Sequence, residues 1–124
     1  MKALYIEGFN SREDVEEKFR VSLPPTIEIL IAIYRQHDYE GYAHVLYADR
    51  STTPAELYDV HGSHCSCYGL EGQWEPKPIT FREYLADVRM GKTWDWQYSD
   101  IARAEIETWI KGIIAESQTA TAPQ

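Results

Sequence analysis

The sequence predicts an α+β protein in which a small antiparallel β-sheet is packed by about four α-helices. Two observations lead to this fold class. Apolar residues recur with helical spacing near both ends of the chain, whereas two segments rich in Val, Tyr and Leu occupy the middle. The length of 124 residues fits one domain, expected over residues 1–116, and the polar tail 117–124 is predicted to be disordered because it has no apolar period.

The N-terminal part of the chain is predicted to contain one short strand and two helices. Residues 3–8 (ALYIEG) form the strand. Ser11 is a suitable N-cap for a helix that ends near Phe19, because acidic residues follow it and Val15 lies four positions before Phe19. Residues 22–37 (SLPPTIEILIAIYRQH) are predicted as a central core helix, since prolines suit a helix start and apolar residues cover most of its circumference.

The middle of the chain is predicted to form an antiparallel strand pair. Residues 42–49 (YAHVLYAD) and 55–62 (AELYDVHG) are the strands, and the turn-like residues RSTTP separate them. Alternation places His44, Leu46 and Ala48 on one face of the first strand. Because both faces are largely apolar, the pair is expected to be covered on both sides.

The C-terminal part is predicted to contain two helices. Thr80 is the expected N-cap of the first helix and Gly91 its stop, and a loop over residues 92–98 precedes Ser99, the expected N-cap of the second helix. The apolar positions expected to face a core are Phe81, Tyr84, Leu85 and Val88 in the first helix, and Ala102, Ile106, Trp109, Ile110 and Ile113 in the second.

Residues 60–74 (VHGSHCSCYGLEGQW) contain the densest group of metal-ligating side chains. His61, His64, Cys65 and Cys67 offer four zinc ligands within seven residues. Structural zinc sites usually draw their ligands from separate elements, so this crowded spacing predicts a protein without a metal or other cofactor. Zinc bound by these four residues is the alternative.

Two other interpretations of this segment stay open. In one, a cysteine thiol is a nucleophile activated by a nearby histidine, with Glu71 or Asp59 orienting the imidazole. In the other, the segment is an ordered loop in which glycines permit positive φ, Cys65 and Cys67 pack as small apolar thiols and Trp74 anchors the loop to the core. No substrate motif accompanies the cysteines, so the sequence favours a non-enzymatic role.

The net charge of −8 is concentrated in the middle of the chain. Residues 37–75 contain seven acidic side chains and a single basic one, Arg50, and hold six of the eight net negative charges. This balance argues against direct binding of nucleic acid, which requires cations to replace condensed counterions. It suits a basic protein partner, or an acidic face that is only solvated.

The sequence also predicts a cytoplasmic location with no membrane partner. The longest apolar run is far shorter than the ~20 residues that a membrane-spanning helix needs. The N-terminus lacks the hydrophobic segment of a signal peptide.

The segment SHCSCYGLEGQWEP (63–76) resembles the signature of a family of small, mostly uncharacterised proteins encoded in bacteriophage and prophage genomes. The segments YEGYAHVLYAD and ELYDV before it are similar too, and the likeness covers about residues 39–90. The resemblance implies an origin in a phage or another mobile element and assigns no catalytic residue. Small acidic phage proteins are often inhibitors that bind host defence or nucleic-acid machinery.

These observations predict a non-catalytic phage protein that acts in the host cytoplasm and inhibits a host defence or nucleic-acid-handling complex, as an anti-CRISPR protein does. Its partner would be a host protein with a basic surface, such as a CRISPR effector complex. The alternative is a zinc-binding or cysteine-dependent protein centred on residues 61–67. The acidic and aromatic side chains expected to contact the partner are Asp38, Tyr39, Glu40, Tyr42, Glu71, Glu75, Trp94 and Trp96.

Overall fold

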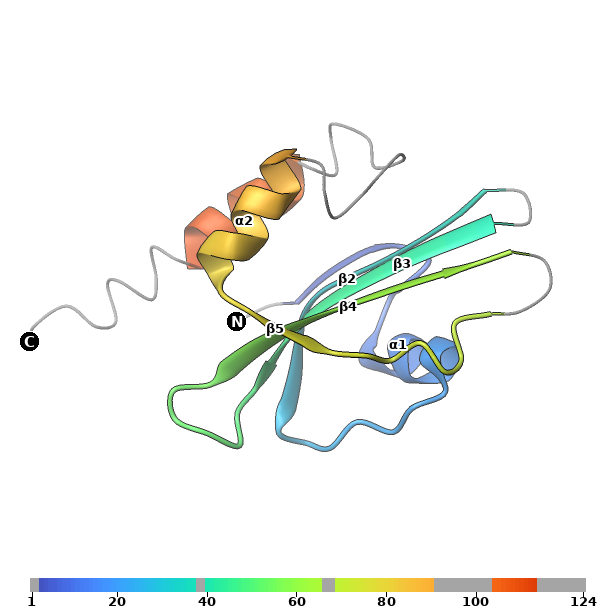
Figure 1. Ribbon diagram of the computed structural model, residues 1–124, viewed down its shortest axis with the longest axis horizontal. Helices are drawn as coiled ribbons and strands as arrows, with labels where there is room; N and C mark the ends of the chain where they lie inside the picture. The colour runs from blue at the N-terminus through green and yellow to red at the C-terminus, as the bar shows by residue number, and fades with distance from the viewer. Residues whose placement is uncertain (1–2, 38–39, 66–68, 91–103, 114–124) are drawn as a thin grey trace, which may run out of the picture. The chain divides into compact units, whose positions relative to one another are not determined.

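A five-stranded β-sheet with strand order β1-β2-β3-β4-β5 is the main element of the structure (Figure 1). This computed structural model describes residues 3–37, 40–65, 69–90 and 104–113. The chain divides into two units, Met1–Ile79, which contains the sheet, and Thr80–Gln124. The expected single domain over residues 1–116 stays a prediction, and the predicted tail lies outside the described residues.

The sequence predicts an antiparallel sheet, but the observed sheet is mixed. Its strands are β1 (Leu4–Glu7), β2 (Ile27–His37), β3 (Glu40–Asp49), β4 (Glu56–His64) and β5 (Lys77–Ile79). β1 runs parallel to β2, and the other three pairs are antiparallel. The parallel pair arises because helix α1 (Arg12–Phe19) lies between β1 and β2 in the chain and returns it to the same end of the sheet. The predicted pairing of 42–49 with 55–62 is confirmed by β3 and β4.

The described residues contain three helices, one fewer than the sequence predicts. They are α1, α2 (Phe81–Met90) and a helix over residues 104–113. None of these helices, in the part of the chain that the structure describes, is long and apolar enough to cross a membrane. The α+β class therefore holds with a larger sheet and fewer helices.

The predicted helix over residues 22–37 is wrong, because most of this segment forms strand β2. β2 is an interior strand that pairs with β1 on one side and β3 on the other. Its residues Ile27 and Ile29 to Tyr34 are buried, so both faces of the strand are apolar and its pattern resembles that of a buried helix. The β-branched isoleucines and the two pairing partners favour the strand.

Helix α1 begins and ends as the sequence predicts. The Ser11 side chain accepts a hydrogen bond from the backbone N–H of Asp14 at 3.2 Å, which caps the N-terminus. Arg20 adopts a left-handed backbone conformation with φ 57°, and its N–H bonds to carbonyls of the last turn. Val15 and Phe19 are both fully buried, as their spacing predicts.

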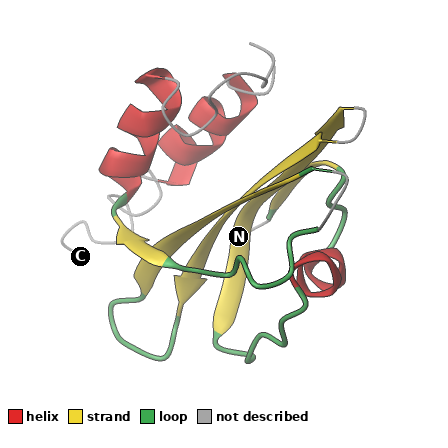
Figure 2. Cartoon of the chain, turned by 45° about the vertical axis from the view of Figure 1, so that its right-hand side comes forward, coloured by secondary structure: helices red, strands yellow, loops and turns green. Residues whose placement is uncertain are grey.

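Helix α1 covers one face of the sheet (Figure 2). Phe19 contacts the rings of Phe9 and Trp74, with centroid distances of 6.4 and 5.1 Å. Trp74 also stacks on Tyr47 of β3 at 5.6 Å, so the predicted anchoring of the 60–74 segment by Trp74 is confirmed. The remaining buried members of this core are Val15, Ile27, Ile29, Ala32, Tyr34, Ala43, Val45, Val60 and Leu70.

The second unit begins with the predicted cap of α2. The Thr80 hydroxyl accepts from the N–H of Glu83 at 3.0 Å, and the Glu83 carboxylate accepts from the N–H of Thr80 at 2.9 Å, which is a capping box. Tyr84 and Val88 of α2 are buried, and the buried residues of the helix over 104–113 are Ile106, Ile110 and Ile113. Gly91, loop 92–98, Ser99 and Ala102 lie outside the described residues.

The interior position of β2 predicts a stability difference between two matched truncations. Ile33 is fully buried and pairs with both Ile6 and His44, whereas Leu4 of the edge strand β1 is only partly buried. Ile33→Ala should lower the free energy of unfolding by about 2–5 kcal/mol, and Leu4→Ala by about 1 kcal/mol. Urea unfolding measures both values, and an equal or larger loss for Leu4→Ala would contradict the strand order.

Candidate functional site

The β3–β4 ladder brings two histidines and an aspartate together on one face of the sheet. His44 of β3 lies directly opposite His61 of β4. Asp59 precedes His61 by two residues and therefore shares its face of the strand. His44, Asp59 and His61 offer ligand atoms that all lie within 4.8 Å of one another. We refer to these three residues as the His–Asp cluster.

Hydrogen bonds define the orientation of the His61 ring. Its Nε2 lies 3.2 Å from Oδ2 of Asp59, and because a carboxylate accepts, the proton of a neutral ring sits on Nε2. Nδ1 then presents a lone pair, which accepts from the Tyr42 hydroxyl at 2.7 Å. The same Nδ1 lies 3.3 Å from Nδ1 of His44.

Burial differs sharply across the His–Asp cluster. His44 is fully buried, the Asp59 side chain is 8% exposed and the His61 side chain is 34% exposed. Burial lowers the pKa of His44 well below its ordinary value of 6.5, and the neighbouring charge of His61 lowers it further. His44 is therefore a neutral imidazole near pH 7.

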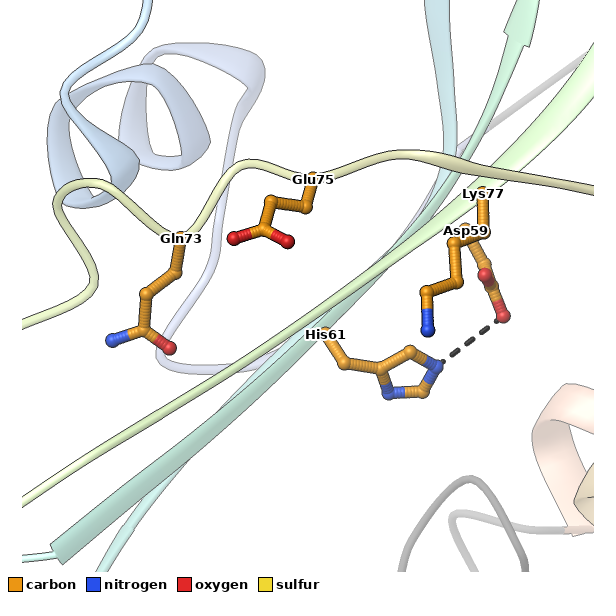
Figure 3. A pocket seen from close by; sticks show the side chains of 5 residues that line it. All are labelled: Asp59, His61, Gln73, Glu75 and Lys77. Carbon is orange, nitrogen blue, oxygen red and sulfur yellow. Dashed lines mark hydrogen bonds and ion pairs between the residues drawn. The ribbon is translucent and has the colours of Figure 1, made fainter.

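A shallow pocket of about 180 Å³ lies beside the cluster. Asp59, His61, Gln73, Glu75 and Lys77 line it, from β4, β5 and the segment between these strands (Figure 3). The view shows the His61 ring and the Asp59 carboxylate joined by their hydrogen bond, with the Lys77 side chain pointing toward the same space. The pocket thus combines an imidazole, two carboxylates, an amide and an ammonium group.

His64 belongs to a separate polar group on the opposite face of β4. His64 is three residues after His61, and alternation along the strand places the two rings on different faces. Its Nδ1 lies 3.1 Å from the Cys65 carbonyl and therefore donates, so Nε2 accepts from the Tyr34 hydroxyl at 2.6 Å. The ring packs over Gly41, where an added Cβ would lie 2.1 Å from Nε2.

The four zinc ligands suggested by the sequence do not form one loop, because β4 continues to His64. His61 and His64 point to opposite faces of the sheet, and Cys67 lies outside the described residues. Cys65 is of intermediate burial. The structure instead combines His61 with Asp59, one of the two acids expected to orient an imidazole, and with His44.

Side-chain hydrogen bonds and Trp74 order the segment that follows β4. The Gln73 amide donates to the Ser63 and Gly69 carbonyls at 2.7 and 2.9 Å, and its oxygen accepts from the Ser63 N–H at 2.8 Å. Of the three glycines expected to need positive φ, Gly72 has a φ of 81°. Residues 69–74 are therefore held in an ordered loop, whereas residues 60–64, expected in the same loop, belong to strand β4.

Half of the residues expected to contact a partner are described. Glu40, Glu71 and Glu75 are exposed, and Tyr42 is partly exposed with its hydroxyl directed at His61. The predicted contact residues that lie outside the described residues are Asp38, Tyr39, Trp94 and Trp96.

His44 is the functional candidate that the sequence analysis missed. The sequence analysis correctly places His44 on the same face of its strand as Leu46. Which residues of β4 lie beside it depends on the register between β3 and β4. Asp49 pairs with Glu56 at the closed end of the hairpin, and counting back from this pair places His44 opposite His61. A prediction that extended the strand pairing to this register would have found the cluster.

Comparison of the chain with protein-family models, with curated proteins and with solved structures gave no match. The geometry of the described residues therefore carries the functional argument.

The buried His44 predicts that acid destabilises the protein. In the unfolded chain His44 binds a proton below about pH 6.5, whereas the folded state keeps the ring neutral until a lower pH. The contribution of neutral His44 to the free energy of unfolding therefore has its full value above pH 6.5. It is lost as the pH falls toward the lowered pKa, by at most about 1.4 kcal/mol per pH unit.

Urea unfolding of the wild type and of the His44→Gln variant between pH 7.5 and 5 measures this contribution. The wild type should lose more stability over this range than the variant. Parallel curves for the wild type and His44→Gln would contradict the assignment of a buried neutral imidazole.

Proposed function

We propose that this protein is a phage-encoded, non-catalytic inhibitor that binds a basic surface of a host complex handling nucleic acid. The host complex would be a defence assembly such as a CRISPR effector, and the site of action the host cytoplasm. The proposal combines the resemblance of residues 63–76 to a phage family with the charge of the sheet-containing unit. Acidic side chains would occupy a groove that normally holds nucleic acid.

The observation that carries this proposal is the excess of accessible acids between β3 and β5. Over the described residues 40–65 and 69–75, the acids are Glu40, Asp49, Glu56, Asp59, Glu71 and Glu75, of which Asp59 alone is buried. The one basic residue there, Arg50, forms an ion pair with Glu28. Few cations in this stretch are therefore available to offset the acids.

Two of these acids lie at the same end of the sheet. Glu40 begins β3 next to Gly41, which pairs with His64 at the end of β4. Backbone N–H groups at Glu71 itself and at Gly69 lower the pKa of the Glu71 carboxyl, and the nearby side chains of Arg20 and His64 lower it further, which places Glu71 near this end of the sheet. Glu71 is thus ionised at neutral pH, and with Glu40 it supplies negative charge where a basic partner would approach.

The proposal predicts that three neutral substitutions weaken partner binding. A Glu40→Gln, Glu71→Gln, Glu75→Gln variant keeps the shape of the side chains and removes three charges. Each exposed change should alter the free energy of unfolding by no more than about 0.5 kcal/mol. Association with the partner recovered by affinity purification from phage-carrying host cells should slow on the order of tenfold at low salt, because electrostatic steering is lost.

A charge-matched control separates a specific acidic surface from net charge. Glu13→Gln, Glu17→Gln and Glu105→Gln remove three exposed acids from α1 and the helix over 104–113. This control should associate nearly as fast as the wild type, and high salt should reduce the difference between the variants. Equal association rates for the two triple variants at low salt would show that the acids near β3 and β4 do not form the binding surface.

A further inference from the structure

The two facing nitrogens of the His–Asp cluster have the spacing of ligands on a single metal ion. Nδ1 of His44 and Nδ1 of His61 are 3.3 Å apart, and their ring centroids are 4.4 Å apart. A tetrahedral zinc ion binds imidazole nitrogens at about 2.0–2.1 Å, so two nitrogens on one ion are separated by about 3.3–3.4 Å. The observed distance therefore matches shared coordination.

A direct hydrogen bond explains this contact less well. The usual range for an N–H donor is about 2.7–3.2 Å, and 3.3 Å lies just beyond it. In addition, Nδ1 of a neutral His61 has one lone pair, which the Tyr42 hydroxyl already approaches at 2.7 Å. A cation between the two rings would use the lone pairs of both imidazoles and displace the Tyr42 hydroxyl from Nδ1 of His61.

Asp59 supplies an independent sign of a metal site. Its nearly buried carboxylate holds Nε2 of His61, which leaves Nδ1 directed at His44. Metal-binding histidines almost always donate their second ring nitrogen to a carboxylate, a carbonyl or a water molecule, and this contact fixes the tautomer and orients the ring. Asp59 is in the position of such a partner.

We propose that His44 and His61 bind a divalent transition-metal ion through their Nδ1 atoms, with Asp59 as the positioning residue. Imidazole ligands favour Zn²⁺ and its first-row neighbours over Mg²⁺ and Ca²⁺, which prefer oxygen. Water completes the coordination. This site uses none of the thiols that the sequence suggested, and it is an alternative to the expectation of a metal-free protein, which stays a prediction.

The cluster also borders a pocket and lies near negative charges that would compensate the charge of a bound cation. The partly exposed His61 borders the pocket that Asp59, Gln73, Glu75 and Lys77 also line. Asp59 and Glu75 balance the charge of a bound cation, and Lys77, which pairs with Asp59 across β4 and β5, limits the excess of negative charge. Glu75 belongs both to this pocket and to the acidic surface of the proposed interaction, but neither His44 nor His61 belongs to that surface, so either proposal can fail alone.

Zinc binding to the full chain tests this proposal. Purified protein freed of metal by chelation is titrated with Zn²⁺ in competition with a chromophoric chelator, and Co²⁺ serves as a spectroscopic probe. The wild type should bind a single Zn²⁺ per chain and give the visible bands of nitrogen-bound Co²⁺. His61→Gln should weaken zinc binding at least 100-fold, and Asp59→Asn by about 10–100-fold, as expected for loss of an orienting carboxylate.

Control variants assign the ion to this cluster. His64→Gln and a Cys65→Ser, Cys67→Ser double variant remove the ligands suggested by the sequence and should bind zinc like the wild type. Circular dichroism and thermal melting establish that each variant is folded, and His44→Gln provides a second ligand variant if His61→Gln is not. The proposal is overturned if the wild type binds no zinc, if folded His61→Gln and His44→Gln retain its affinity, or if only the cysteine variant loses binding.

Discussion

The register of the β3–β4 hairpin, in which Asp49 lies opposite Glu56 at the closed end, determines which side chains meet along both strands. From this pair, the antiparallel ladder places Val45 opposite Val60 in the core beneath α1, and His44 opposite His61 on the other face. A slip of one residue would move every side chain of one strand to the opposite face. The apolar core and the His–Asp cluster therefore depend on the same register.

Strand β4 uses its alternation to separate two polar groups. His61 is directed to Asp59, His44 and Tyr42, and His64 is directed to Tyr34 on the face that α1 covers. The two histidines are three positions apart in the chain, yet they share no hydrogen-bond partner among the described contacts. This separation explains why a cluster that looks like one ligand set in the sequence is two sites in the structure.

Local signals in the sequence were sufficient to predict the helices that begin at a clear capping residue and the strands that adjoin a clear turn. Ser11 and Thr80 cap their helices as predicted, and the Val, Tyr and Leu content of residues 42–49, followed by the turn-like residues 50–54, identifies β3. The helix prediction for the segment that becomes β2 failed because a strand buried on both faces shows no alternation of apolar and polar residues. An unbroken apolar run fits a buried helix equally well. Its partners, β1 and β3, lie elsewhere in the chain.

The sequence predicted only part of the candidate site, for a related reason. The sequence alone suggested that Glu71 or Asp59 orients an imidazole, and Asp59 is the one that contacts His61. His44 is 17 residues from His61, and a propensity argument cannot supply the register that joins them. The predicted thiol and histidine ligands were grouped by proximity in the chain, which ignores that successive side chains of a strand face opposite ways.

Cross-strand nuclear Overhauser effects in the solution NMR spectrum test the register most directly. The account predicts contacts between the backbone protons of His44 and His61 and between those of Val45 and Val60, together with a contact between the two imidazole rings. A set of contacts shifted by one residue, with His44 opposite Val60 or Gly62, would contradict it. Such a shift would move either His44 or His61 to the face covered by α1 and separate the proposed ligands.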